Sequence, residues 1–272
     1  MSQTFSQEDR KNKIRRGEPI ELLGLTFYPI TMRYYERFLV CSAALMLRQA
    51  AFPVKYAVKD YMSAIWTLEI DSIQERGIKF GLFESLINLL FLSLRIEMDF
   101  NEFMRSNIAL KEEQNEINID HIHITQNGKS VDIKPIDFSL KIRPLLAEQN
   151  GLDLPKEFEN LDLVNDADEL KRRNQSKQKL NHNIDDLIAS VAYLSHVDEQ
   201  ELDNWTVKQF EARKRAIERA YHYSIYGQAE MSGMVKFEKG NPYPSWCFDV
   251  SDDSMGTVEM DKLVKIFGES EK

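Results

Sequence analysis

The segment from Asn204 to Trp246 constrains the fold of this chain more than any other stretch of its sequence. Its first half carries large apolar side chains at intervals of three, four and seven residues, the spacing of one face of an α-helix. These side chains are Val207, Phe210, Ile217, Tyr221 and Ile225. Asn204 is the predicted N-cap, because its side-chain oxygen can accept a hydrogen bond from an amide of the first turn. Gly233 is the predicted end of the helix.

The second half of this segment is an aromatic, proline-rich tail. Pro244 lies between Tyr243 and Trp246, and proline stiffens both itself and the residue before it. Either the rings fold back onto the helical hairpin as a lid on the core, or the tail is an arm that inserts into a groove of another protein. Tyrosine and tryptophan are enriched at the energetic centres of interfaces. The predicted partner-binding residues are Trp205, Phe210, Tyr221, Tyr243 and Trp246.

The whole sequence predicts a mainly α fold, a helical bundle-like arrangement with one small β-hairpin. A short N-terminal strand pair is expected at residues 19–30, on either side of Gly24. The hairpin is expected at residues 116–134, because isoleucines alternate on both sides of Asn127-Gly128 and that dipeptide suits a type I′ turn. Apolar periodicity predicts helices in the ranges 31–50, 54–74, 81–98, 101–114, 138–150 and 184–197.

These elements predict four parts along the 272 residues. Residues 1–18 are polar and are expected to form a mobile arm. Residues 19–115 are expected to form an N-terminal helical domain, and the hairpin at residues 116–134 follows it. Residues 135–272 are expected to form a C-terminal helical domain with the extended aromatic tail.

The charge balance argues against a general nucleic-acid-binding protein. The formal net charge is −9, whereas a nucleic-acid-binding surface needs a basic face that displaces counterions. Two short basic runs, at residues 11–16 and 171–179, are the places where local anion contact could occur. Nucleic acid is therefore not expected to be the main partner.

Several features predict a protein of a reducing compartment. Cys41 and Cys247 are the only cysteines, and two distant cysteines do not form a disulfide framework.

The apolar run at residues 81–98 contains Glu84, Asn88 and Arg95, so we interpret it as a buried helix rather than a membrane span. The N-terminal residues have no apolar core of the kind a secretory signal carries.

The sequence shows no arrangement of residues that predicts catalysis, so we expect a protein that is not an enzyme and has no cofactor. His121 and His123 share one face of a predicted strand, but a zinc site needs further ligands, and no metal site is expected. Asp249, Ser251 and Asp253 alternate as in a calcium loop, yet the glycine and the closing glutamate of such a loop are missing. No phosphate loop is present around Gly227.

Several segments, in their order along the chain, resemble proteins from the tail gene clusters of phages that infect Gram-positive bacteria. They are YPITMRYYERF (28–38), FSLKIRPLLAEQNG (138–151), IDDLI (184–188), NWTVKQF (204–210), AEMSGMVKF (229–237) and PSW (244–246). The chain is most similar to tail-assembly-chaperone-type proteins of that group. The resemblance implies a mainly helical protein without a catalytic site that binds the tape-measure protein and tail-tube subunits in the host cytoplasm.

Two alternatives stay open beside a tail assembly chaperone. The chain could be a structural tail, baseplate or connector subunit, which would remain in purified particles. It could also be a nucleic-acid-associated regulator that uses the basic run at residues 171–179, and its binding to DNA would then depend on salt. Self-association is left open as well.

Overall fold

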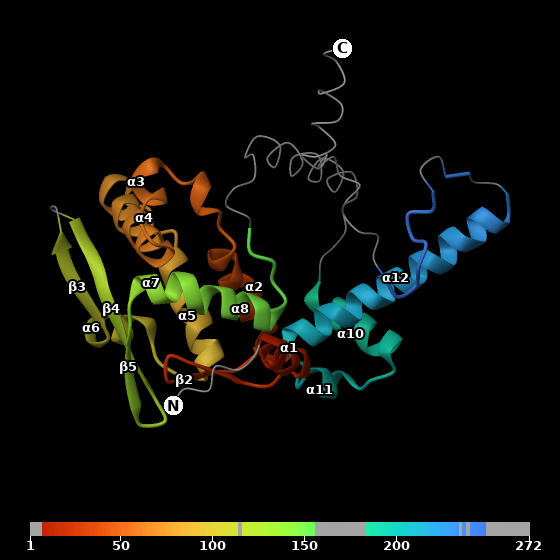
Figure 1. Ribbon diagram of the computed structural model, residues 1–272, viewed down its shortest axis with the longest axis horizontal. Coiled ribbons are helices and arrows are strands. Elements are labelled where there is room, and N and C mark those ends of the chain that lie inside the picture. Colours follow the sequence, from red (N-terminus) through yellow and green to blue (C-terminus); the bar gives the residue numbers. More distant parts are fainter. Residues whose placement is uncertain (1–6, 114–115, 156–182, 234–235, 238–239, 249–272) are drawn as a thin grey trace, which may run out of the picture. The chain divides into compact units, whose positions relative to one another are not determined.

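A computed structural model describes residues 7–113, 116–155, 183–233, 236–237 and 240–248 of the chain (Figure 1). The chain divides into two compact units, Met1–Glu211 and Ala212–Lys272. This division differs from the predicted one, because the predicted boundaries near residues 115 and 135 both fall inside the first unit. The boundary between the units falls inside the helix that contains Phe210 and Tyr221.

The described residues form a mainly α fold with two small antiparallel sheets, as the sequence predicts. The strands are β1 (Ile20–Leu22), β2 (Leu25–Phe27), β3 (Ile108–Glu113), β4 (Glu116–Gln126) and β5 (Lys129–Ile133). Up to β3, the helices and 3₁₀ turns are α1 (Gln7–Arg16), η1 (Met32–Tyr34), α2 (Tyr35–Ser42), η2 (Ala43–Leu45), η3 (Gln49–Ala51), α3 (Val54–Ala57), α4 (Tyr61–Arg76), α5 (Leu82–Leu94) and α6 (Phe100–Ser106). After β5 come α7 (Pro135–Asp137), the π-helix η4 (Phe138–Ile142), α8 (Arg143–Asn150), α10 (Ile184–Ser195), α11 (Glu199–Leu202) and α12 (Val207–Met231).

The larger sheet has three strands in the order β3-β4-β5, although only the β4-β5 hairpin was predicted. The hairpin turn is confirmed: Asn127 and Gly128 both have positive φ, at 52° and 75°. Residues 108–113 read IALKEE, which are mostly strong helix formers, so the sequence predicts a helix there. Antiparallel pairing with β4 overrides that local preference. The prediction of a helix over 101–114 is therefore wrong beyond Ser106.

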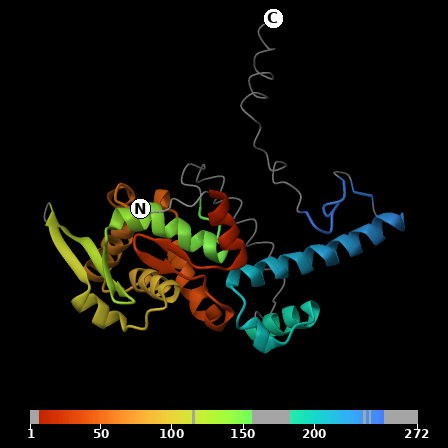
Figure 2. The same cartoon turned by 60° about the horizontal axis from the view of Figure 1, so that its bottom comes forward.

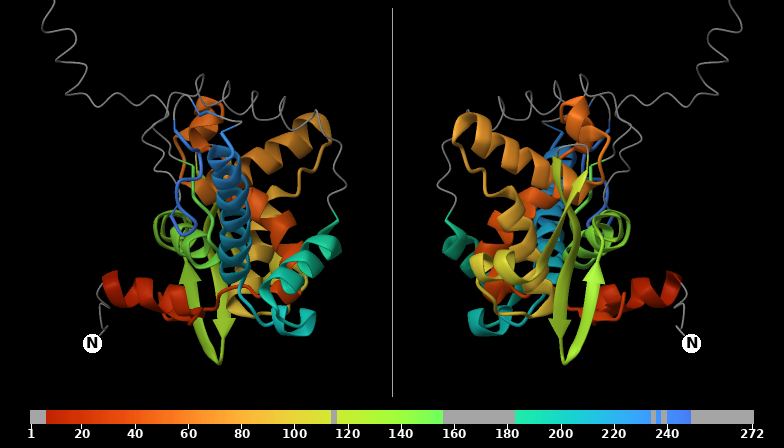
Figure 3. Two further views of the ribbon diagram at one scale, coloured as in Figure 1. Left: turned by 90° about the vertical axis from the view of Figure 1, so that its right-hand side faces the viewer. Right: turned by 90° about the vertical axis from the view of Figure 1, so that its left-hand side faces the viewer.

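The sheet contacts helices α4 and α7 through β4, and Figures 1 and 2 show these elements side by side. In the right-hand view of Figure 3 the strands lie in front, with helices of the first unit behind them. Gln126, at the end of β4, donates from its side-chain amide to the carbonyls of Thr26 and Leu94, both at 2.8 Å. Its amide oxygen accepts from the Thr26 N–H at 2.7 Å. This one side chain therefore links the larger sheet to β2 and to the end of α5.

Helix α5 is the central core helix of the first unit. Leu86, Ile87, Leu89 and Leu90 are all 0% exposed, which agrees with the interpretation of this run as a buried helix. Among the described residues, we find no helix with the length and apolar character that a membrane crossing requires. The helix ends at Leu94, and the C-cap residue that follows it, Arg95, has a φ of 55°.

The predicted mobile arm is helical over part of its length, because residues 7–16 form α1. Ile14 is 5% exposed, and Arg10 forms an ion pair with Glu148 of α8 at 2.8 Å. The prediction is therefore corrected for these residues. The sequence signal is too weak to predict that this polar helix packs against the rest of the unit, because Ile14 is its only buried apolar side chain.

The start of α12 is also corrected, because Thr206 rather than Asn204 caps it. The Thr206 hydroxyl accepts from the Gln209 N–H at 3.1 Å, and the Gln209 side chain accepts from the Thr206 N–H at 2.9 Å. This reciprocal pair is a capping box. The same segment is held to residues 30–32, since Met32 N–H donates to the Trp205 carbonyl and Val207 N–H to the Ile30 carbonyl, both at 2.9 Å.

Candidate partner-binding surface

The two predicted contact residues at the start of α12 belong to the first unit, and one of them is a core residue. Phe210 is 0% exposed, and its ring lies 5.5 Å from the ring of Tyr35 at an angle of 57°. Phe210 is therefore corrected from a surface contact to a core contact, because packing removes it from solvent. Trp205 is half-buried.

Tyr35 also contacts the turn of α12 that contains Phe210. Its hydroxyl donates to the Glu211 carboxylate at 2.7 Å. Burial of the Tyr35 phenol raises its pKa, and the hydrogen bond to the Glu211 carboxylate raises the pKa further. The neutral, donating form of Tyr35 is therefore the form that fits this site.

In the second unit, the aromatic tail folds back onto α12. The Tyr243 ring stacks on His222, with centroids 4.5 Å apart and an angle of 17°. Tyr243 also lies 5.2 Å from Tyr226, whose ring contacts Phe237 at 5.5 Å. His222 and Tyr226 are one turn apart on the helix, so they present one face to the tail. Tyr243 therefore folds back onto a helix, but it covers half-exposed residues of α12 and not the core, whose residues on this helix are Val207 and Phe210.

Polar contacts hold the tail at both ends of this aromatic cluster. Asn241 donates to the Glu230 carboxylate at 3.1 Å, and its side-chain oxygen accepts from the Tyr243 N–H at 2.9 Å. Further along, Arg219 donates to the Cys247 carbonyl at 3.0 Å. The backbone from Asn241 to Cys247 is therefore tied to α12 over about three turns of that helix.

This arrangement leaves a set of large side chains in solvent, which we call the aromatic surface. Its members and their exposed fractions are Tyr221 (54%), Tyr223 (41%), Ile225 (58%), Met231 (89%), Trp246 (65%) and Phe248 (74%). Tyr221 and Trp246 were predicted as contact residues. Tyr223 was also considered as a residue that faces a partner, Ile225 was predicted only as part of the apolar helix face, and Phe248 was not predicted because it follows the tail motif.

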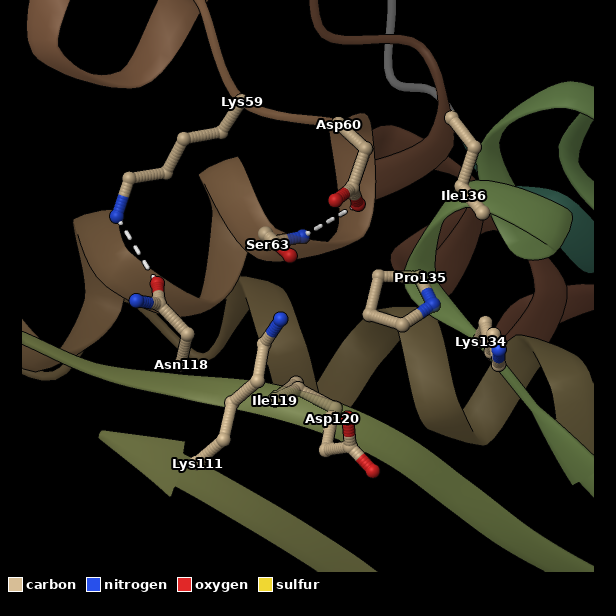
Figure 4. A pocket seen from close by; sticks show the side chains of 10 residues that line it. All are labelled: Lys59, Asp60, Ser63, Lys111, Asn118, Ile119, Asp120, Lys134, Pro135 and Ile136. Atoms are coloured by element: carbon tan, nitrogen blue, oxygen red, sulfur yellow. Dashed lines mark hydrogen bonds between the residues drawn. The ribbon is translucent and has the colours of Figure 1, made fainter. Parts of the chain in front are cut away.

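The first unit contains a separate cavity of ≈ 660 Å³ between the larger sheet and the helices (Figure 4). Lys59 lies just before α4, Lys111 on β3 and Lys134 between β5 and α7. The Lys59 ammonium donates to the oxygens of Asn118 and Thr67, both at 3.0 Å. No sequence pattern predicts this grouping, because β3 was predicted to be a helix. The remaining lining residues are Asp60, Ser63, Ile119, Asp120, Pro135 and Ile136.

The two histidines of β4 lie on one face of the sheet, as predicted, and share an aspartate of β5. Asp132 Oδ1 lies 2.7 Å from His123 Nδ1 and 3.8 Å from His121 Nε2. The hydrogen bond from His123 lowers the pKa of the Asp132 carboxyl. Within the described ranges, no group of three or more His, Cys, Asp or Glu side chains is placed to hold a metal ion.

Some of the sequence hypotheses lie outside the described residues. They concern the basic run at residues 171–179 and the aspartates after residue 248. Comparisons of the chain with models of protein families, with curated proteins and with solved structures found no match.

Proposed function

We propose that this chain is a non-enzymatic phage tail assembly factor that binds other tail proteins through the aromatic surface. The sequence resemblance supports the assignment to tail assembly, with the tape-measure and tail-tube proteins as partners and the host cytoplasm as the place of action. The observation that carries the protein-binding function is the folded-back tail, which stacks Tyr243 on His222 while Trp246 and Phe248 stay largely in solvent.

The contacts of the tail give this surface a physical role. Trp246 and Phe248 lie two residues apart on the tail and both stay largely in solvent, and large aromatic side chains are enriched at the energetic centres of protein interfaces. Because Arg219 and Asn241 already tie the tail to α12, a partner does not have to order that backbone when it binds. Preordering lowers the entropic cost of association.

The proposed mechanism is temporary cover of an apolar partner helix. An aggregation-prone helix of a tail protein would pack against Trp246 and Phe248 of the tail. Polymerisation of the partner would then compete for the same apolar face and release the factor. No covalent chemistry is required at any step.

The test is a pull-down of the full-length chain after co-expression with the products of the neighbouring genes. The double variant Trp246→Ala/Phe248→Ala should lose at least about tenfold in affinity, the scale of an interface hot spot. Tyr193→Ala is the matched control, because Tyr193 is a 78% exposed aromatic residue of the first unit. Unchanged binding of the double variant, or equal loss in the control, would refute the aromatic surface as the contact.

A second measurement separates an assembly factor from a structural subunit. An assembly factor should be absent from purified particles, whereas a structural subunit would be retained at a fixed stoichiometry. Light scattering on the purified wild-type chain and on the double variant shows whether the same surface also supports self-association.

A further inference from the structure

We propose that the stack of Tyr243 on His222 makes docking of the tail (residues 240–248) onto α12 depend on pH, with tighter docking when the imidazole carries a proton. This pH dependence belongs to the tail itself, and we expect it whether or not a partner protein binds there. Three features support it: the geometry of the stack, the exposure of its two rings and the charges around them.

The two rings are placed for an attraction between a cation and an aromatic face. Their centroids lie 4.5 Å apart, and their planes are 17° from parallel. A cation within about 6 Å of the centre of a tyrosine ring is attracted by the negative face of that ring. An imidazolium at His222 therefore gains this attraction in addition to the contact between two neutral rings, and the gain exists only while the tail is docked.

The stack is also open enough to exchange protons with water. His222 and Tyr243 are both half-buried, so the imidazole can be protonated without leaving the Tyr243 ring. Tyr226 lies 6.0 Å from His222 and 5.2 Å from Tyr243, measured between ring centroids, and it supports the stack from one side. At a partly exposed site, a cation–aromatic contact changes an equilibrium constant by about two- to fivefold.

The charged groups around His222 do not oppose this attraction as a set. On α12, Glu218 and Arg219 lie on the preceding turn and carry opposite charges, so their influences on the imidazolium oppose each other. Residues 240–248 contain no Asp, Glu, Lys, Arg or His, and Lys236, in the described segment before them, is exposed. The tail therefore brings an aromatic face to the imidazole and no like charge.

The other contacts of the tail with α12 keep their character in the same pH range. Histidine is the only side chain that ordinarily changes charge between about pH 5 and pH 8. Asn241 donates to the Glu230 carboxylate and Arg219 donates to the Cys247 carbonyl, and neither contact involves a histidine. Because docking favours the protonated imidazole, its contribution is present at the acid end of this range and is lost as pH rises.

The test follows docking in the full-length chain through quenching of a bimane fluorophore by Trp246. The fluorophore is attached at Ala216→Cys in a Cys247→Ser background, and the remaining cysteine, Cys41, is buried. Position 216 is exposed and lies one turn before Arg219, which holds the tail beside Trp246. Tryptophan quenches bimane only at short range, so quenching reports the docked tail. Trp246→Phe gives the unquenched signal.

The ratio of docked to free tail should rise about two- to fivefold between about pH 8 and about pH 5.5. His222→Phe keeps a stacked ring without a titrating charge, so it should show no rise, and Tyr243→Leu should show none either. His121→Phe is the matched control, because it removes a histidine of the first unit, and it should behave as the wild type does.

An equal rise in His222→Phe and wild type would overturn the proposal, and so would a ratio that falls toward acid pH. The series is repeated with Asn241→Ala, which weakens docking by removing the contact with Glu230, so that complete docking of the wild-type tail cannot hide the change. A constant ratio in both backgrounds would also overturn it. No partner protein is present in these measurements, so their failure is distinguishable from failure of the pull-down that tests the proposed function.

Discussion

Replacing Gln126 by leucine should destabilise the first unit by about 3 kcal/mol. The Gln126 side chain makes three hydrogen bonds, to the N–H and carbonyl of Thr26 and to the carbonyl of Leu94. A typical hydrogen bond contributes about 1 kcal/mol net, and a buried partner left unpaired costs more than that. Because Gln126 is only 9% exposed, water cannot fully replace the lost amide. The variant would also loosen the sheet that carries Lys111 of the cavity.

The measurement is urea unfolding followed by tryptophan fluorescence in a Trp246→Ala background. The remaining tryptophans, Trp66 and Trp205, then both report on the first unit. Thr125→Val is the matched control, because Thr125 is the neighbouring residue and its hydroxyl contacts an exposed serine; its effect should stay within about 0.5 kcal/mol. A Gln126→Leu variant as stable as the control would show that this side chain does not join the sheet to β2 and α5.

Three further predictions follow from individual contacts. Thr206→Ala should lower the free energy of unfolding by about 1 kcal/mol through loss of the capping box, while Thr206→Ser should retain most of it; equal loss in both would contradict the cap. Because the pKa of Asp132 is lowered by His123, the stability that its carboxylate contributes is present above its unfolded pKa of about 3.9 and is lost as pH falls through the folded value. Urea midpoints of wild type and Asp132→Asn should therefore differ above the unfolded pKa and converge once pH falls below the folded pKa of Asp132, and a constant difference would argue against the contact. The raised pKa of Tyr35 means that its contribution is present below the ordinary tyrosine pKa of about 10 and is lost only as pH rises through the folded value. An alkaline absorbance titration should show a late-ionising tyrosine that is missing in Tyr35→Phe, and identical titrations would refute this reading of the contact with Glu211.

Local signals in the sequence were enough for several elements. Asn127-Gly128 predicted the hairpin turn, because few other residues tolerate positive φ at both positions. Gly77 and Gly151 follow the last residues of α4 and α8 with φ of 66° and 72°, as expected at helix C-termini. The capping box of Thr206 and Gln209 could also have been read from the sequence, since its spacing is a known start signal. These features depend only on neighbouring residues.

The N-terminal arm, β3 and Phe210 were predicted incorrectly for one shared reason. Helix propensity favoured a helix over residues 108–113, but pairing with β4 made them a strand. Polarity favoured a mobile arm, but burial of Ile14 docks α1. Periodicity placed Phe210 on an apolar face, yet it could not show that Tyr35 covers that part of the face.

Local patterns along the chain were therefore enough to predict the mainly α class, the hairpin turn, the buried character of α5 and the aromatic tail. The tertiary structure alone decided which of those aromatic side chains remain exposed, and it brought Lys59, Lys111 and Lys134 to one cavity. Backbone preferences and turn geometry act between neighbouring residues, so they can be read along the chain. Burial and charge clustering depend on residues that are far apart in sequence and meet only when the chain has folded.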